Sequence, residues 1–270
     1  MLKVPEAEYN YKLWLGHGIT TVRGVPFGEM DWSLRERERS AQNEITAPRM
    51  VSYHVPGSGK EWVGKQILTP NDARKWVRWA AKKGIDGLKL DAYRPEIMKA
   101  LLDEGNRHGL GSMAHLRQTG VARMNALDAS RLGLGTVTHF YGIFEALYDD
   151  HDVQPWPVDM NYSDEQLRFS QVARQWNLIN PQGSEAWNTL IDEFLNLNVI
   201  LDPTMTAYIA TRNVMAARRS DWHTEYTLPS LWDFYTPNPN SHGSYYPDWT
   251  TWDEVAWTRF YRKWKDLSLI

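Results

Sequence analysis

The sequence predicts an α/β fold, in the form of a partial (β/α)8 barrel of the TIM type. Short apolar runs alternate with amphipathic helical patterns between residues 84 and 142, which predicts parallel strands joined by helices. The runs end at regular intervals on Lys89, His115 and His139, which are 26 and 24 residues apart. This spacing suits successive βα units. The 270-residue chain has about the length of one barrel domain, typically ~250 residues.

The apolar runs predict strands and the amphipathic patterns predict helices between them. Several helix ends carry recognisable signals: Thr69 and Asp72 form a capping box around Pro70, and Gly84 stands where that helix would end. Capping boxes are also predicted for Ser163 with Gln166 and for Thr251 with Glu254. The expected strands are 19–23, 50–54, 85–89, 110–115, 135–139 and 199–204; the expected helices are 6–15, 33–45, 70–83, 95–107, 121–132 and 184–197, with two more beginning at Ser163 and Thr251.

Three of the predicted strands end on a residue with functional chemistry. Ligands of parallel α/β folds bind at the carboxyl ends of the strands, so Lys89, His115 and His139 are expected to line one rim. Taken singly, such a histidine is often a hydrogen-bonded core residue, and such a lysine is often a surface charge. Three such residues at the ends of successive strands favour a shared site. His54 ends the preceding strand, and is either a rim residue that touches substrate or a turn residue.

Lys89 allows two chemistries. A desolvated lysine loses its charge readily and then reacts as an amine. With carbon dioxide it forms a carbamate, an oxygen ligand able to bridge two metal ions. With a carbonyl substrate it forms a Schiff base, as in some lyases. The residues alone leave both chemistries open.

Four short motifs resemble the amidohydrolase superfamily, close to its imidazolonepropionase-like and prolidase-like branch. They are Gly18-Ile19-Thr20-Thr21-Val22-Arg23, Gly87-Leu88-Lys89-Leu90, Met113-Ala114-His115 and Val137-Thr138-His139, which are similar to the family's second, fourth, fifth and sixth barrel strands. The resemblance in order and spacing covers residues 8 to about 205. Each motif is short, and their succession is the specific feature.

The resemblance implies a metal-dependent hydrolase that cleaves carbon–nitrogen bonds with a metal-activated water. Lys89 would be carboxylated and would bridge two divalent metal ions, with zinc the expected metal, while His115 and His139 would complete the shell of one ion. The implied substrates are small molecules: dipeptides, N-acyl amino acids or cyclic amides. The candidate substrate contacts on the rim are His54, Tyr93, Arg117 and Tyr141.

The chain also departs from the family pattern. None of its eight histidines forms the His-x-His pair of the family's first strand, and the eighth strand, with its general-base aspartate, is not encoded. No catalytic residue is therefore identified. We read the chain as barrel strands two to seven, expected to be inactive alone. It is also expected to associate through the sheet edges 19–23 and 199–204, as oligomers or aggregates.

The domain prediction is one incomplete barrel over residues 1–270. Residues 143–197 are expected to form a helical insertion and residues 205–270 a Trp-rich insertion, of which 222–249 would cover the carboxyl rim as a lid. Two alternatives remain. One is a Schiff-base lyase that uses Lys89, and the other is a non-catalytic barrel remnant that serves binding or assembly.

Composition narrows the function classes. The net charge of −3 gives no broad basic surface, which argues against a nucleic-acid partner. No apolar run approaches the ~20 residues of a membrane span, so no membrane partner is expected. The absence of cysteine excludes thiolate metal sites and cysteine nucleophiles but leaves the compartment open. The 14 tryptophans are expected to serve mainly in packing.

Overall fold

The structure, a computed structural model, is an α/β fold that divides into two compact units. Unit 1 comprises residues 1–142 and 193–200, and unit 2 comprises residues 143–192 and 201–270. The strands form one six-stranded sheet in the order β1-β2-β3-β4-β5-β6, so that neighbours in sequence are neighbours in the sheet. The structure describes residues 4–24, 29–120, 123–148, 156–212, 216–217, 219–234 and 248–268.

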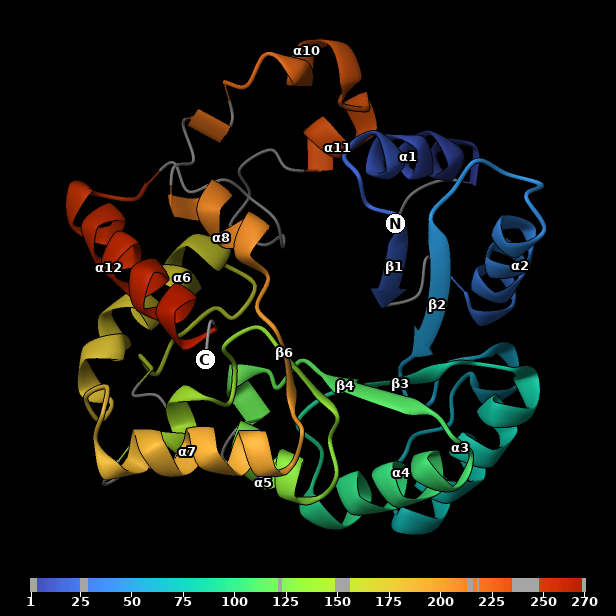
Figure 1. The fold of residues 1–270 in the computed structure, drawn as a ribbon, viewed down its shortest axis with the longest axis horizontal. Helices are drawn as coiled ribbons and strands as arrows, with labels where there is room; N and C mark the ends of the chain where they lie inside the picture. The colour runs from blue at the N-terminus through green and yellow to red at the C-terminus, as the bar shows by residue number, and fades with distance from the viewer. Residues whose placement is uncertain are drawn as a thin grey trace. The chain divides into compact units, whose positions relative to one another are not determined.

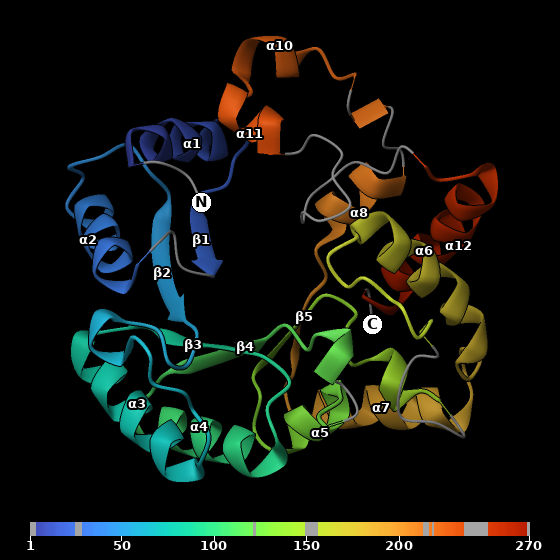
Figure 2. The same cartoon turned by 180° about the vertical axis from the view of Figure 1, so that it is seen from behind.

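Unit 1 is built on a curled parallel sheet that has the form of half a barrel (Figures 1 and 2). Each strand from β1 to β5 pairs in parallel with the next, wherever the registers are given. The predicted α/β class and parallel alternation are thus confirmed, whereas the assignment to barrel strands two to seven stays a prediction. The strands are β1 (Thr21–Gly24), β2 (Arg49–His54), β3 (Gly87–Leu90), β4 (Gly111–Ala114), β5 (Thr136–Thr138) and β6 (Ile200–Asp202).

The helices α2 to α5 of unit 1 alternate with the strands, and the helices cover the outer face of the sheet (Figures 1 and 2). α3 packs beside α4, and α2 packs on β2. Apolar residues on α1, on β2 and in the segment between α2 and β2 close the end of this layer, where Ala7, Tyr11, Ile45 and Met50 form a buried cluster. The helices are α1 (Val4–Gly16), α2 (Met30–Ala41), α3 (Pro70–Lys83), α4 (Pro95–Arg107) and α5 (Ala126–Arg131).

Helix ends follow local sequence signals, with some shifts from the prediction. The Thr69–Asp72 capping box of α3 is present, and Gly84 ends that helix in a left-handed conformation with φ 88°. α2 ends before the predicted residue 45, because Asn43 adopts φ 58°. α5 begins at Ala126 rather than Val121, since the Asn125 side chain caps it by accepting from the backbone N–H of Asp128.

Unit 2 is mainly helical. The predicted capping residues are each displaced by one position: Asp164, rather than Ser163, caps α6, and Thr250 with Asp253, rather than Thr251 with Glu254, caps α12. α7 crosses from unit 2 into unit 1. The helices are α6 (Glu165–Gln175), α7 (Glu185–Asn196), α8 (Met205–Arg212), α10 (Trp222–Tyr226), α11 (Pro229–Phe234) and α12 (Thr251–Leu267).

Aromatic residues form the core of unit 2, where α12 packs against α6 and α8. The indole N–H of Trp257 donates to the Tyr208 carbonyl at 3.2 Å, and that of Trp264 donates to the Pro203 carbonyl at 3.0 Å. A buried indole N–H needs a hydrogen-bond acceptor, and both tryptophans find one in the backbone. Their role is therefore in packing. α10 and α11 lie in the predicted lid, but residues 235–247 lie outside the described residues. The lid stays a prediction.

Within the described ranges, no helix is long and apolar enough to cross a membrane.

Tyr53 fills the concave side of the unit 1 sheet at a point where two strands carry glycine. A Cβ on Gly87 would lie 2.4 Å from the Tyr53 ring, and a Cβ on Gly111 would lie 1.9 Å from its hydroxyl oxygen. Gly87 pairs with both Tyr53 and Gly111 in register. The two glycines therefore make room for one large side chain of the neighbouring strand.

We predict that Gly87→Ala lowers the free energy of unfolding by about 1–3 kcal/mol, the usual cost of overpacking a core. Gly135→Ala is the matched control, because its Cβ would meet its nearest neighbour at an ordinary 3.5 Å. Urea denaturation checks both variants. The Gly87→Ala cost should shrink in a Tyr53→Leu background, and an unchanged cost there would contradict the packing explanation.

Candidate functional site

The site is positioned by the register of β3, β4 and β5. Lys89 lies opposite Met113, which lies opposite Thr136. The backbone N–H of His115 donates to the Leu90 carbonyl at 3.0 Å, so the pairing of β4 with β3 extends to the histidine. Because the strands are parallel, the residues that follow them emerge at the same edge of the sheet.

Three rings meet beyond β4 and β5. The His115 and His139 ring centroids are 4.8 Å apart, with the rings edge to face at 82°. The Tyr141 ring contacts both, at 4.7 Å from His115 and 5.2 Å from His139. Both imidazoles are half-buried and Tyr141 is buried. The structure thus brings together the two histidines predicted from strand spacing, and adds a tyrosine as their common neighbour.

The loop that carries His139 and Tyr141 has an unusual backbone. His139 adopts φ 67°, the left-handed region, which non-glycine residues seldom occupy. Gly142 adopts φ 85°, and a Cβ there would lie 2.8 Å from the backbone nitrogen of Ala126. That nitrogen donates to the Gly142 carbonyl at 3.0 Å. The first residue of α5 therefore holds the loop, and the left-handed turn directs the His139 ring to His115.

Lys89 lies on the concave face of the sheet and is only 8% exposed. Side chains alternate along a strand, so Lys89 shares the face of Gly87, which is the face that Tyr53 covers. The Met113 position opposite Lys89 is likewise on the face of His115. The Lys89 side chain therefore lies on the same face of the sheet as that of His115. Its register partner, Met113, comes two residues before His115, so Lys89 lies further from the edge of the sheet.

Arg23 and Thr136 form a polar bridge on this concave face that sequence reasoning missed. The Arg23 guanidinium donates to the Thr136 hydroxyl at 3.2 Å, and it lies over the Tyr53 ring at 5.6 Å. The bond joins β1 to β5 although 113 residues separate the two positions. The pair of glycines at matching strand positions, Gly87 and Gly111, was a sequence signal for the large Tyr53 side chain beside this bridge, but the bridge itself had no local signal.

His54 does not lie on the rim, in contrast to the predicted substrate contact. Its side chain is fully buried, and its Nε2 lies 3.4 Å from the Ser33 hydroxyl of α2. The Ser33 hydroxyl also lies 3.1 Å from that of Ser52. The cause is strand parity: His54 shares its face with Ser52 and Met50, which turn to the helices, whereas Tyr53 turns to the concave side. His54 is therefore a core residue.

Arg117 and Tyr93 lie in the loops after β4 and β3. Arg117 forms an ion pair with Asp91, and 55% of the Arg117 side chain is exposed. Burial and the neighbouring Asp91 raise the pKa of Tyr93 to about 12, against a lowering effect of Arg117. The Tyr93 phenol is therefore protonated at neutral pH. A substrate carboxylate that reached Arg117 would compete with Asp91 for it.

The metal-ligand chemistry of the site depends on Lys89. No cluster of three or more His, Asp or Glu side chains suited to a metal occurs in the part of the chain that the structure describes. Two imidazoles supply two nitrogen ligands, which fits zinc, but zinc takes four ligands. A carboxylated Lys89 would supply an oxygen ligand. If Lys89 is carboxylated, it fits a metal ion together with His115 and His139.

Comparison with known proteins leaves the family open. No family model matches this chain, and no curated protein matches it. A crystal structure of an uncharacterized protein is similar over 95% of this chain and 53% of that one, with 14% identity and a TM-score of 0.46. This chain therefore spans about half the length of that protein. The amidohydrolase resemblance rests on the sequence motifs alone.

We predict that His54 makes stability depend on pH. Burial is the main reason that its pKa falls from 6.5 to about 4, with Arg37 also lowering the pKa and Asp86 raising it. A lowered pKa in the folded state means that stability is full above pH 6.5 and is lost as the pH falls towards 4. The loss should approach roughly 3 kcal/mol at pH 4, at about 1.4 kcal/mol per pKa unit.

The measurement is urea denaturation between pH 7.5 and 4, compared with His54→Leu. The difference in unfolding free energy between the two proteins should change with pH in this window. His17→Gln is the control, because His17 is exposed and bonds only its own helix, through the Leu13 carbonyl at 2.7 Å. Parallel pH profiles for His54→Leu and the unaltered chain would contradict the prediction.

Proposed function

We propose that this chain carries the metal-binding half-barrel of an amidohydrolase, with Lys89, His115 and His139 as ligands. The observation that supports the proposal is the pair of imidazoles at adjacent strand ends, with centroids 4.8 Å apart. Two histidines that follow adjacent parallel strands with their rings edge to face, next to a strand that carries a buried lysine, suit metal binding better than they suit simple core packing. The substrates proposed are dipeptides, N-acyl amino acids or cyclic amides.

Each protein group has a defined task in this proposal. The uncharged Lys89 amine adds to carbon dioxide: an N–C bond forms, one N–H proton leaves, and a carbamate anion results. Its burial favours the uncharged amine, since a buried ammonium loses hydration. His115 and His139 offer neutral ring nitrogens, and the Tyr141 ring fixes the orientation of both imidazoles. A bound divalent ion would lower the pKa of a water and polarise the substrate carbonyl.

Substrate recognition is assigned to the loops after β3 and β4. Arg117 is the exposed cation nearest in sequence to His115, and its guanidinium suits the carboxylate of a dipeptide or an N-acyl amino acid. Tyr93, protonated at neutral pH, would donate a hydrogen bond to a substrate oxygen. Release of Arg117 from Asp91 would accompany binding of the carboxylate.

The proposal predicts zinc binding that depends on both histidines. His115→Ala and His139→Ala should each weaken zinc affinity by more than about tenfold, because each removes a ligand. His108→Ala is the matched control, as this exposed histidine lies at the far end of α4. Competition with a metal-sensitive dye gives the affinity without an activity assay. Equal affinities for all four proteins would contradict the site.

A second prediction concerns the carbamate. Incubation with ¹³C-bicarbonate and zinc should give a carbamate carbon signal in the NMR spectrum, and Lys89→Arg should abolish it, because the guanidinium stays protonated. Zinc binding without this signal would contradict the carbamate. Trapping of a carbonyl compound on Lys89 by borohydride would instead favour the Schiff-base lyase.

A further inference from the structure

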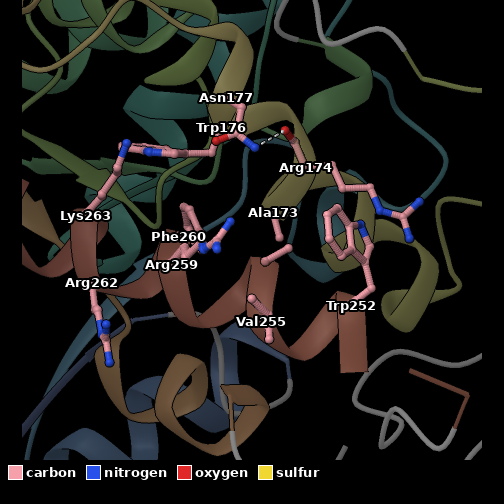
Figure 3. A pocket seen from close by; sticks show the side chains of 11 residues that line it. Ala173, Arg174, Trp176, Asn177, Trp252, Val255, Arg259, Phe260, Arg262 and Lys263 are labelled. Carbon is pink, nitrogen blue, oxygen red and sulfur yellow. Dashed lines mark hydrogen bonds between the residues drawn. The ribbon is translucent and has the colours of Figure 1, made fainter. Parts of the chain in front are cut away.

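Unit 2 contains a pocket between α6 and α12 that the proposed function does not use. Its volume is about 290 Å³, close to the lower limit of ~300 Å³ for small-molecule sites. The buried residues Ala173, Trp176 and Phe260 form its floor. Such a volume suits a ligand of one or two fused rings. Figure 3 shows the residues that line the pocket.

The pocket has a one-sided charge. Its eleven lining residues include three arginines and a lysine, and none of the eleven is acidic. Arg174 is partly neutralised by Asp253, whose carboxylate lies 2.6 Å from the guanidinium. Arg259 and Lys263, one helical turn apart on α12, form no ion pair with any residue that the structure describes. Two cationic groups are thus available to an anion at the edge of an aromatic floor.

Apolar surface at the same place is unusually exposed. Trp252 is 68% exposed and Val255 is 41% exposed, and both line the pocket. The Lys263 ammonium lies 5.8 Å from the Trp176 ring centre, and Figure 3 shows its side chain extending to this ring. The Trp252 indole stands beside Arg174 in the same view. Ring stacking and charge pairing are therefore offered within one small pocket.

We propose that this pocket binds a small aromatic carboxylate. The ring lies against the exposed side chains of Trp252 and Val255, above the buried Trp176 and Phe260. The carboxylate accepts hydrogen bonds from Arg259 and Lys263. A neutral ring compound would gain the apolar contact but not the charge pairing. An aliphatic anion would gain the charge pairing but not the stacking.

The test uses 1-naphthoate and its neutral analogue 1-naphthalenemethanol in equilibrium dialysis with the full chain. Naphthoate should bind saturably and at least about tenfold more tightly than the alcohol, which is the ratio expected from one charge-assisted contact. The double variant Arg259→Gln/Lys263→Gln should remove this preference. Lys265→Gln is the matched control, since Lys265 is exposed on the same helix, pairs with Asp266 and does not line the pocket.

Salt provides a readout that does not depend on a variant. Raising sodium chloride to 0.5 M should weaken binding of naphthoate and leave binding of the alcohol unchanged, because salt screens exposed charges. Equal affinity for the acid and the alcohol, equal loss in Lys265→Gln, or salt-independent naphthoate binding would each overturn the proposal. So would self-association of the chain that excludes naphthoate from the pocket, observed by sedimentation.

Discussion

Parallel pairing of β3, β4 and β5 is the constraint on which the candidate site depends. The register sets Lys89, Met113 and Thr136 side by side, so the chain leaves all three strands at one edge of the sheet. His115 follows β4 directly and His139 follows β5 directly. A shift of one residue in the pairing of β4 with β3 would turn His115 to the opposite face of the sheet. His139 has the strand parity of Val137, which pairs with Ala114 on the other face, so its ring reaches His115 only because its backbone is left-handed. The short distance between the two imidazoles therefore depends on the register and on this turn together.

This register is maintained on the concave face of the sheet by specific contacts rather than by a simple apolar core. Tyr53 occupies the space left by Gly87 and Gly111, and Arg23 reaches Thr136 across the face. On the opposite face of β2, the Ser52 and His54 side chains contact the Ser33 hydroxyl of α2. Both faces of the sheet thus carry polar groups. Their hydrogen bonds are specific to one register, whereas contacts between aliphatic side chains would allow the strands to slip past one another. Beside them, the left-handed His139 directs its ring inward.

Sequence periodicity predicted most of the strand–helix order because that order is encoded locally, in apolar runs and helix caps. Thr69, Asp72 and Gly84 behave as their residue types indicate. The prediction was wrong where two neighbouring residues could serve equally, as with Asp164 and Thr250, each one position from the expected cap. For His54 the predicted strand end at residue 54 agrees with β2, but side chains alternate along a strand, and His54 falls on the buried face that turns to α2.

Contacts distant in sequence could not be predicted from local patterns. The Arg23–Thr136 bond spans 113 residues, and the meeting of Tyr141 with both histidines depends on the turn at His139. The pocket between α6 and α12 joins segments about 80 residues apart, and only the packing of α12 brings Arg259 and Lys263 to Trp176. The cations and the aromatic residues can be read from the sequence, but the residues that they contact cannot.

The central claim is that Lys89, His115 and His139 hold one metal site, and X-ray absorption of the zinc-loaded chain tests it most directly. The spectrum at the zinc edge counts and identifies the atoms bonded to the metal. The account predicts two imidazole nitrogens at about 2.0 Å together with oxygen ligands at about 2.0–2.2 Å. A spectrum with oxygen ligands alone, or with one imidazole, would contradict the claim that both strand-end histidines bind the same ion.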